Sequence, residues 1–145
     1  MQVSVLCGSK CRAGGMRSVL STASWLLGAG LTAVMGLIHL RLWLDGYREI
    51  PVIGTLFMLN AIISGVLVAA LLAVPARLRS AAAITTALFT TGTLVGLILS
   101  LTIGLFGMHE ILQAPLVIPT LVVEPVGVLM LLLAAVPPDR RRRPH

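Results

Sequence analysis

Apolar residues dominate four stretches of the chain, which short polar segments separate. The stretches run over residues 18–44, 53–74, 81–108 and 114–136. A helix needs about 20 apolar residues to cross ~30 Å of hydrocarbon, and each stretch reaches that length. The pattern therefore predicts an all-α, polytopic membrane protein with four transmembrane helices in one compact bundle.

The composition agrees with this fold class and limits what else the chain can hold. Hydrophobic residues make up 57% and charged residues 11% of the sequence, with a mean hydropathy of +1.01, beyond the range of soluble domains. We expect a disordered cytoplasmic N-terminus at residues 1–16, the transmembrane domain at 17–137 and a basic cytoplasmic tail at 138–145. Met16 is an alternative start of the protein. The short connectors leave no room for a soluble catalytic domain.

The net charge is +6, and nine of the eleven basic residues form three groups that fall on one side of the membrane if the spans alternate. This is the positive-inside pattern, and it predicts that both termini are cytoplasmic. Such groups fix topology and contact anionic lipid headgroups, so we expect the lipid bilayer as a partner and no nucleic acid. The groups are Lys10, Arg12 and Arg17, then Arg77 and Arg79, then the arginines at 140–143.

Small residues recur at spacings of four and eight positions along the first and third stretches. Residues four apart lie on one face of a helix, and small side chains let membrane helices approach closely. Two interpretations stay open: packing within the bundle, or contact with a second copy or a larger membrane complex. The residues are Gly28 and Gly36, and Gly92, Gly96, Ser100 and Gly104.

The two halves of the chain align weakly at a shift of 62 residues. Gly30 then falls on Gly92, and Gly65 falls on Gly127. If the similarity reflects a duplication, the domain consists of two tandem helical hairpins. The alternative is the chance similarity that apolar sequences share.

Polar residues gather at the ends of the first and third stretches, which the expected topology places at the extracytoplasmic face. One interpretation is an interfacial belt anchored at the lipid headgroups, in which Arg41 pairs with Asp45 one helical turn away. The other is a polar site in which His39 and His109 converge and hold a metal, a haem or a quinone headgroup. The remaining members of this layer are Trp43, Tyr47, Arg48, Glu49 and Glu110.

Glu124 lies about ten residues into the fourth stretch, near the bilayer centre. A charge there costs about 2.5–3.5 kcal/mol on insertion scales, so the side chain should face the bundle and be protonated or paired. Candidate partners are Asn60, His39 and Arg41. The prolines of this stretch predict a kinked or partly unwound outer half. Glu124 is then either a proton- or substrate-binding carboxyl, or a neutral acid bonded to carbonyls that the prolines free.

Several segments resemble small, uncharacterised four-span membrane proteins of high-GC Gram-positive bacteria. The most specific is residues 46–51 (GYREIP), and the resemblance covers about residues 25–136. It implies a bacterial plasma-membrane location and no particular activity. The general plan also resembles DoxX-type four-helix proteins, although their distinguishing motifs are missing. The other segments that carry the resemblance are 39–43 (HLRLW), 53–60 (IGTLFMLN) and 103–107 (IGLFG), with Glu110 and Glu124.

The sequence contains no phosphate-binding loop, HExxH or nucleophile motif, which favours a non-enzymatic role. The leading hypothesis is a subunit or accessory factor of a plasma-membrane complex. One alternative is a small transporter or proton-coupled permease that uses Glu124. A further alternative is a redox protein that binds haem or quinone through His39 and His109. Metal and cofactor stay open.

Overall fold

The computed structural model describes residues 3–107 and 109–136, with side chains from Val19 onward. All regular elements in these ranges are helical, as the sequence predicts. They are α1 (Val3–Leu44), a short 3-10 helix η1 (Tyr47–Glu49), α2 (Ile53–Ala73), a second 3-10 helix η2 (Ala76–Leu78), α3 (Arg79–Thr102) and α4 (Val117–Ala135).

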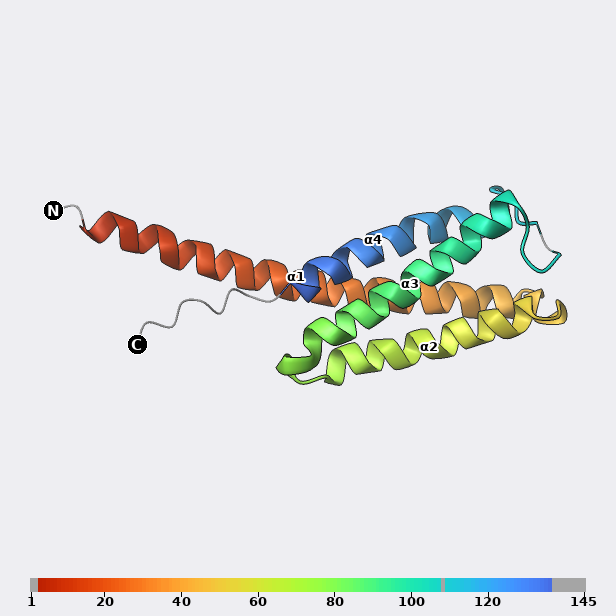
Figure 1. Ribbon diagram of the computed structural model, residues 1–145, viewed down its shortest axis with the longest axis horizontal. Coiled ribbons are helices and arrows are strands. Elements are labelled where there is room, and N and C mark those ends of the chain that lie inside the picture. Colours follow the sequence, from red (N-terminus) through yellow and green to blue (C-terminus); the bar gives the residue numbers. More distant parts are fainter. Residues whose placement is uncertain (1–2, 108, 137–145) are drawn as a thin grey trace.

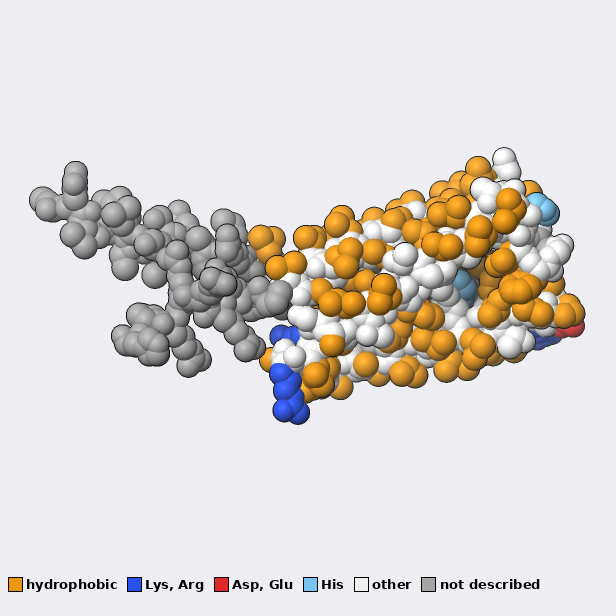
Figure 2. All heavy atoms as spheres, in the orientation of Figure 1, with side chains coloured by type: hydrophobic (Ala, Val, Ile, Leu, Met, Phe, Trp, Pro, Cys, Tyr) orange, Lys and Arg blue, Asp and Glu red, His pale blue; other side chains and the backbone are white. Residues whose placement is uncertain are grey.

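Four segments are long and apolar enough to cross a membrane, which confirms the predicted count. They are Val19–Leu44, Ile53–Ala73, Ala76–Thr102 and Val117–Ala135. Apolar side chains cover most of the face of the bundle in Figure 2, as a surface in contact with lipid tails requires.

The connection between α3 and α4 is longer than the sequence predicts. α3 ends at Thr102 rather than at 108, and α4 begins at Val117 rather than at 114. Gly104 (φ +80°), two residues after the last residue of α3, and Gly107 (φ +79°) adopt left-handed backbone conformations. Glycine adopts such a conformation without steric cost, and the conformation does not continue an α-helix.

α4 is one continuous helix from Val117 to Ala135, so the predicted unwinding is confined to residues 114–116, and the predicted kink stays a prediction. Pro119 lies in the first turn, where a backbone N–H has no helical partner to lose. Pro125 lies inside the helix and removes one hydrogen bond without interrupting it.

α1 begins at Val3, so the described backbone is helical where the sequence predicts disorder. Its span-length apolar part begins at Val19, close to the predicted domain boundary at 17. The cytoplasmic location of residues 1–16 and the start at Met16 stay predictions. The basic tail at 138–145 lies outside the described residues.

The helices pack as two hairpins, and one seam between them is open. α1 packs against α2 and α4, and α3 packs against α4. α2 and α3 contact each other little, and they diverge from the turn that joins them (Figure 1). The two hairpins fit a tandem duplication, which stays a prediction.

The apolar core lies at the end of the bundle where α2 and α3 are joined. Trp25, Leu71, Ala83 and Leu131 are buried there in one cluster. The guanidinium of Arg79 lies 5.7 Å from the Trp25 ring centroid, at a distance typical of a cation–π contact. Packing is therefore dense at this end, while the diverging helices leave space at the other.

The glycines of the first and third stretches differ in how closely neighbouring helices approach them. A Cβ on Gly36 would lie 2.7 Å from Ser64 Cβ of α2, and one on Gly28 would lie 2.8 Å from Leu131 Cδ2 of α4. Neither Gly92 nor Gly96 has such a neighbour within 4 Å. Gly28 and Gly36 of α1 therefore lie in contacts within the bundle, and Gly92 and Gly96 of α3 do not.

Candidate ligand-binding cavity

A cavity of about 460 Å³ lies between the diverging ends of α2 and α3. Figure 2 shows the molecule hollowed between these helices, with a pale-blue histidine side chain visible inside. All four helices contribute to its walls. Its volume falls in the range of pockets that hold small molecules.

The mouth of the cavity is formed by apolar side chains that line it and are also exposed at the surface of the bundle. Leu56 and Leu59 of α2 are 41% and 45% exposed, and Leu88 of α3 is 69% exposed, although all three line the cavity. They lie within membrane-spanning segments. The cavity therefore opens on the side of the bundle, through the apolar surface of segments that are long enough to span a membrane.

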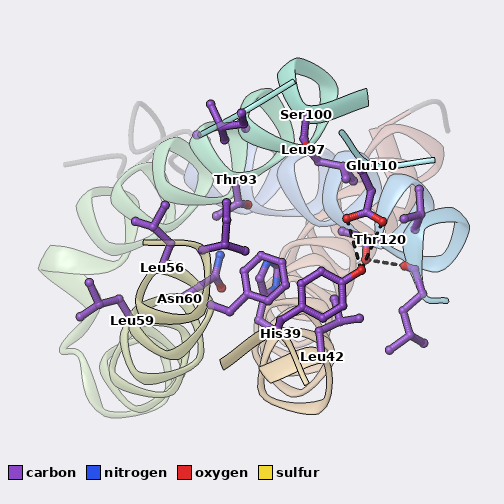
Figure 3. Close-up of a pocket in the computed structure, with 18 of the residues that line it drawn as sticks. His39, Leu42, Leu56, Leu59, Asn60, Thr93, Leu97, Ser100, Glu110 and Thr120 are labelled. Carbon is purple, nitrogen blue, oxygen red and sulfur yellow. Dashed lines mark hydrogen bonds between the residues drawn. The ribbon is translucent and has the colours of Figure 1, made fainter. Parts of the chain in front are cut away.

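The inner wall carries hydrogen-bonding side chains. Asn60 is 6% exposed, and the Ser64 hydroxyl donates to its backbone carbonyl over 2.6 Å, with its side-chain oxygen 3.1 Å away. Neither contact uses the two N–H donors of the Asn60 amide, which are left for a ligand. Thr93, Ser100 and Thr120 also line this wall. Figure 3 shows how these side chains surround the cavity.

Three aromatic rings form the end of the cavity beside η1. Phe57 contacts His39 edge-on, with ring centroids 5.3 Å apart, and stacks on Tyr47 at 5.1 Å. The Nδ1–H of His39 donates to the Met35 carbonyl over 2.9 Å, because a carbonyl oxygen can only accept. In the neutral ring, Nε2 is then an acceptor.

Tyr47 and Glu110 join the two connecting segments at this end. The Tyr47 hydroxyl donates to the Glu110 carboxylate, with distances of 3.2 and 3.3 Å to its two oxygens (Figure 3). Burial, the nearby Glu110 charge and this hydrogen bond together raise the pKa of Tyr47. The backbone N–H of Glu110 donates to Ser100 O over 3.2 Å, which holds the α3–α4 connection against the end of α3.

The rest of the predicted polar layer points away from the cavity. Arg41 pairs with Asp45 at 3.0 Å, as their spacing predicts, and Arg48 pairs with Glu49 at 2.9 Å. These side chains, like Trp43, are not part of the cavity lining. The layer is therefore divided between a cavity wall and an outer rim.

The structure does not bring His39 and His109 to one site. His39 lines the cavity, whereas His109 is exposed and its ring lies against Gly104. Among the described residues, no three histidine, cysteine or acidic side chains come together as metal ligands would.

Glu124 is the most deeply buried ionisable side chain of the described bundle, with 1% exposure, and neither of its oxygens has a hydrogen-bond partner there. None of its three predicted partners bonds to it. Asn60 bonds to Ser64, His39 to Met35 and Arg41 to Asp45. The cavity lining does not include Glu124.

Sequence reasoning missed three residues of the site. Phe57 and Thr93 line the cavity directly, and Thr120 lies one turn before Glu124 on α4. Thr120 could have been predicted from the sequence, because it lies four residues before Glu124 and therefore on the same helix face. Nothing in the sequence distinguishes Thr93 from the other threonines of α3.

No family model, curated protein or solved structure matches this chain. The resemblance to small four-span proteins of high-GC Gram-positive bacteria therefore stays a prediction.

Proposed function

We propose that this chain is a small four-span membrane protein that takes up a membrane-dissolved amphiphile in the cavity between α2 and α3. One observation carries the proposal. The cavity has an apolar mouth on the lipid-facing side of the bundle, and hydrogen-bonding groups at its inner wall and at the end beside η1. A molecule with a polar head and an apolar chain matches that order. It can enter from the bilayer without crossing water.

The charges around the cavity select the kind of headgroup. Among the described residues that line it, Glu110 is the one carboxylate and none is a lysine or arginine; His39 also lines it, with its Nδ1–H bonded to the Met35 carbonyl. Arg41 and Arg48 lie outside the cavity and pair with acids of their own. An anionic head would meet the Glu110 carboxylate with no free cation beside it, and like charges at close range disfavour binding. The site therefore suits a neutral hydrogen-bonding head or a cationic one.

Three amphiphiles with the same chain test this proposal: dodecanol, dodecylamine and dodecyl phosphate. Each is added to the protein in mild detergent, and binding is measured by native mass spectrometry. We expect the alcohol and the amine to bind and the phosphate to bind at least tenfold more weakly. Equal binding of all three would contradict the headgroup argument.

Cavity and surface variants separate specific from general lipid binding. Gly96→Leu places a side chain in the cavity, whereas Gly30→Leu places the same side chain where no neighbour lies within 4 Å and no cavity is lined. We expect the first to abolish amphiphile binding and the second to leave it unchanged. Equal binding by both variants would contradict the proposed site.

The location of the protein is also part of the proposal. We place it in a bacterial plasma membrane with the α2–α3 turn and both termini in the cytoplasm, a topology that the basic residues before, between and after the spans support.

The hypothesis of an accessory subunit concerns the partner rather than the ligand. Extraction from the native membrane in mild detergent, followed by native mass spectrometry, tests it. A stoichiometric protein partner supports the subunit hypothesis. A monomer that carries a small molecule supports the cavity alone.

A further inference from the structure

We infer that Glu124 is a proton-binding site inside the membrane, reached from the α2–α3 cavity past the side chain of Thr93. The proton site is inferred from the burial of Glu124 and from the groups around it. The route to it rests on the proposed function, because the route runs through the ligand cavity.

The first step is the state of the carboxyl group. The Glu124 side chain is 1% exposed, and neither oxygen has a hydrogen-bond partner in the described part of the chain. An ionised carboxylate buried without partners is strongly disfavoured, and such a group neutralises instead. The carboxyl therefore holds its proton in this arrangement.

The neighbouring hydroxyl groups fit a protonated carboxyl rather than a charged one. The Thr93 hydroxyl lies near the Glu124 carboxyl, but its proton is donated to Thr90 O over 2.8 Å. The Thr120 hydroxyl donates to Leu116 O over 2.7 Å. A hydroxyl has one proton to donate, so these groups have only acceptor lone pairs left. A protonated carboxyl can donate to them, whereas a carboxylate can only accept.

Pro125 adds a further acceptor at the same level. It has no backbone N–H, so the carbonyl of Leu121, four residues earlier in α4, lacks its helical donor. Side chains on a helix lean toward its N-terminus, which brings Glu124 toward that turn.

The register of α1 against α4 sets the depth of the carboxyl. A Cβ on Gly127 would lie 3.4 Å from the Leu31 side chain. The helices are antiparallel, so one turn further on, Met35 of α1 lies opposite Glu124 of α4. Met35 is also buried, with 1% exposure.

Thr93 lies between this level and the cavity. Its hydroxyl is 3.5 Å from the Met35 sulfur, it lies near Glu124, and the residue lines the cavity. Thr120, one turn from Glu124 along α4, lines the cavity as well. The Thr93 side chain is therefore the described group that touches both the cavity and the surroundings of Glu124, and we place the route there.

The surrounding helices provide no counter-charge that would ionise the carboxyl. α2 has no titratable residue, and α3 has only Arg79, at its first position and beside Trp25. The described span of α1 contributes His39, which faces the cavity, and Arg41, which pairs with Asp45.

Carbodiimide labelling of the whole protein in lipid vesicles tests the proton site. The carboxyl proton passes to a nitrogen of the reagent and the carboxyl oxygen bonds to its central carbon. After rearrangement to an acylurea, the peptide is heavier by the full mass of the reagent. We expect apolar dicyclohexylcarbodiimide to modify Glu124 and a water-soluble carbodiimide to leave it intact. Peptide mass spectrometry locates the adduct, and Glu124→Gln should remove it.

The route past Thr93 is tested by the rate of this reaction. Thr93→Ala should speed the labelling of Glu124 severalfold, whereas Thr91→Ala, at an exposed position of the same helix, should not change it. Dodecanol in the cavity should slow the labelling in the wild type. The dodecanol measurement uses only the wild-type protein, so it tests the route even if a substitution prevents folding.

Each result decides one point. No adduct on Glu124 with the apolar reagent would overturn the proton site. An adduct that forms equally fast with dodecanol bound would overturn the route through the cavity. Labelling without any dodecanol binding would contradict the proposed function and support the proton site by itself.

Discussion

Tyr47 is the single tyrosine of the chain, so its ionisation can be followed without interference. Its hydroxyl donates to Glu110, and burial and this carboxylate both disfavour the phenolate. The neutral form is thus favoured in the folded protein. The stabilisation is complete below the ordinary pKa of 10.0 and is lost as the pH rises through the higher value of the folded state.

This predicts a phenolate titration with its midpoint above 10.0 in the folded protein. Glu110→Gln removes the charge and should lower the midpoint. Glu49→Gln, at an exposed acid paired with Arg48, should leave it in place. Ultraviolet absorbance of the phenolate measures all three. A midpoint that does not respond to Glu110→Gln would show that the Tyr47–Glu110 contact is not formed.

Glu124 also predicts a stability effect at the scale of one residue. Replacing a buried, unpartnered polar group by an apolar one removes a desolvation cost of about 1–3 kcal/mol. We therefore expect Glu124→Leu to raise the melting temperature in detergent. Val122→Leu, at a 57% exposed position of the same helix, is the matched control and should change little. A lower melting temperature for Glu124→Leu would mean that the carboxyl has a partner in the membrane.

At the scale of the helices, glycine position decides how closely two of them approach. α1 meets α2 at Gly36, where an added Cβ would lie 2.7 Å from Ser64 Cβ. That atom is attached directly to the backbone of α2, so it cannot rotate away. α3 has no such contact at Gly92 or Gly96, and both line the cavity instead.

Gly36→Ala should therefore force α1 and α2 apart and destabilise the bundle by about 1–3 kcal/mol, as overpacking does. Gly30→Ala tests the same change on the same helix where nothing lies within 4 Å, and it should be neutral or slightly stabilising. Thermal unfolding in detergent compares the two. Equal effects would mean that α1 and α2 are further apart than this packing requires.

At the scale of the whole molecule, the two ends of the bundle differ in charge. Arg77 and Arg79 lie at the α2–α3 turn, while the opposite end combines arginines with acids in ion pairs. The excess of positive charge at one end predicts that it faces the cytoplasm.

Single-cysteine labelling of intact bacteria checks this orientation. With Cys7 and Cys11 replaced by serine, Gln113→Cys lies in the α3–α4 connection and Ala76→Cys in the α2–α3 turn, both at exposed positions. A membrane-impermeant maleimide should label Gln113→Cys in whole cells and Ala76→Cys only after lysis. The reverse pattern would invert the topology.

The sequence by itself determined the class of protein, the number of spans and the Arg41–Asp45 pair, because each depends on local length, composition or spacing along one helix. It could not determine the cavity, the Tyr47–Glu110 contact or the unpartnered state of Glu124, since these depend on which helix faces meet. Membrane helices that are apolar on every side have no amphipathic stripe to indicate that choice. Only the packing of α1 against α2 and α4, and the divergence of α2 from α3, decided it.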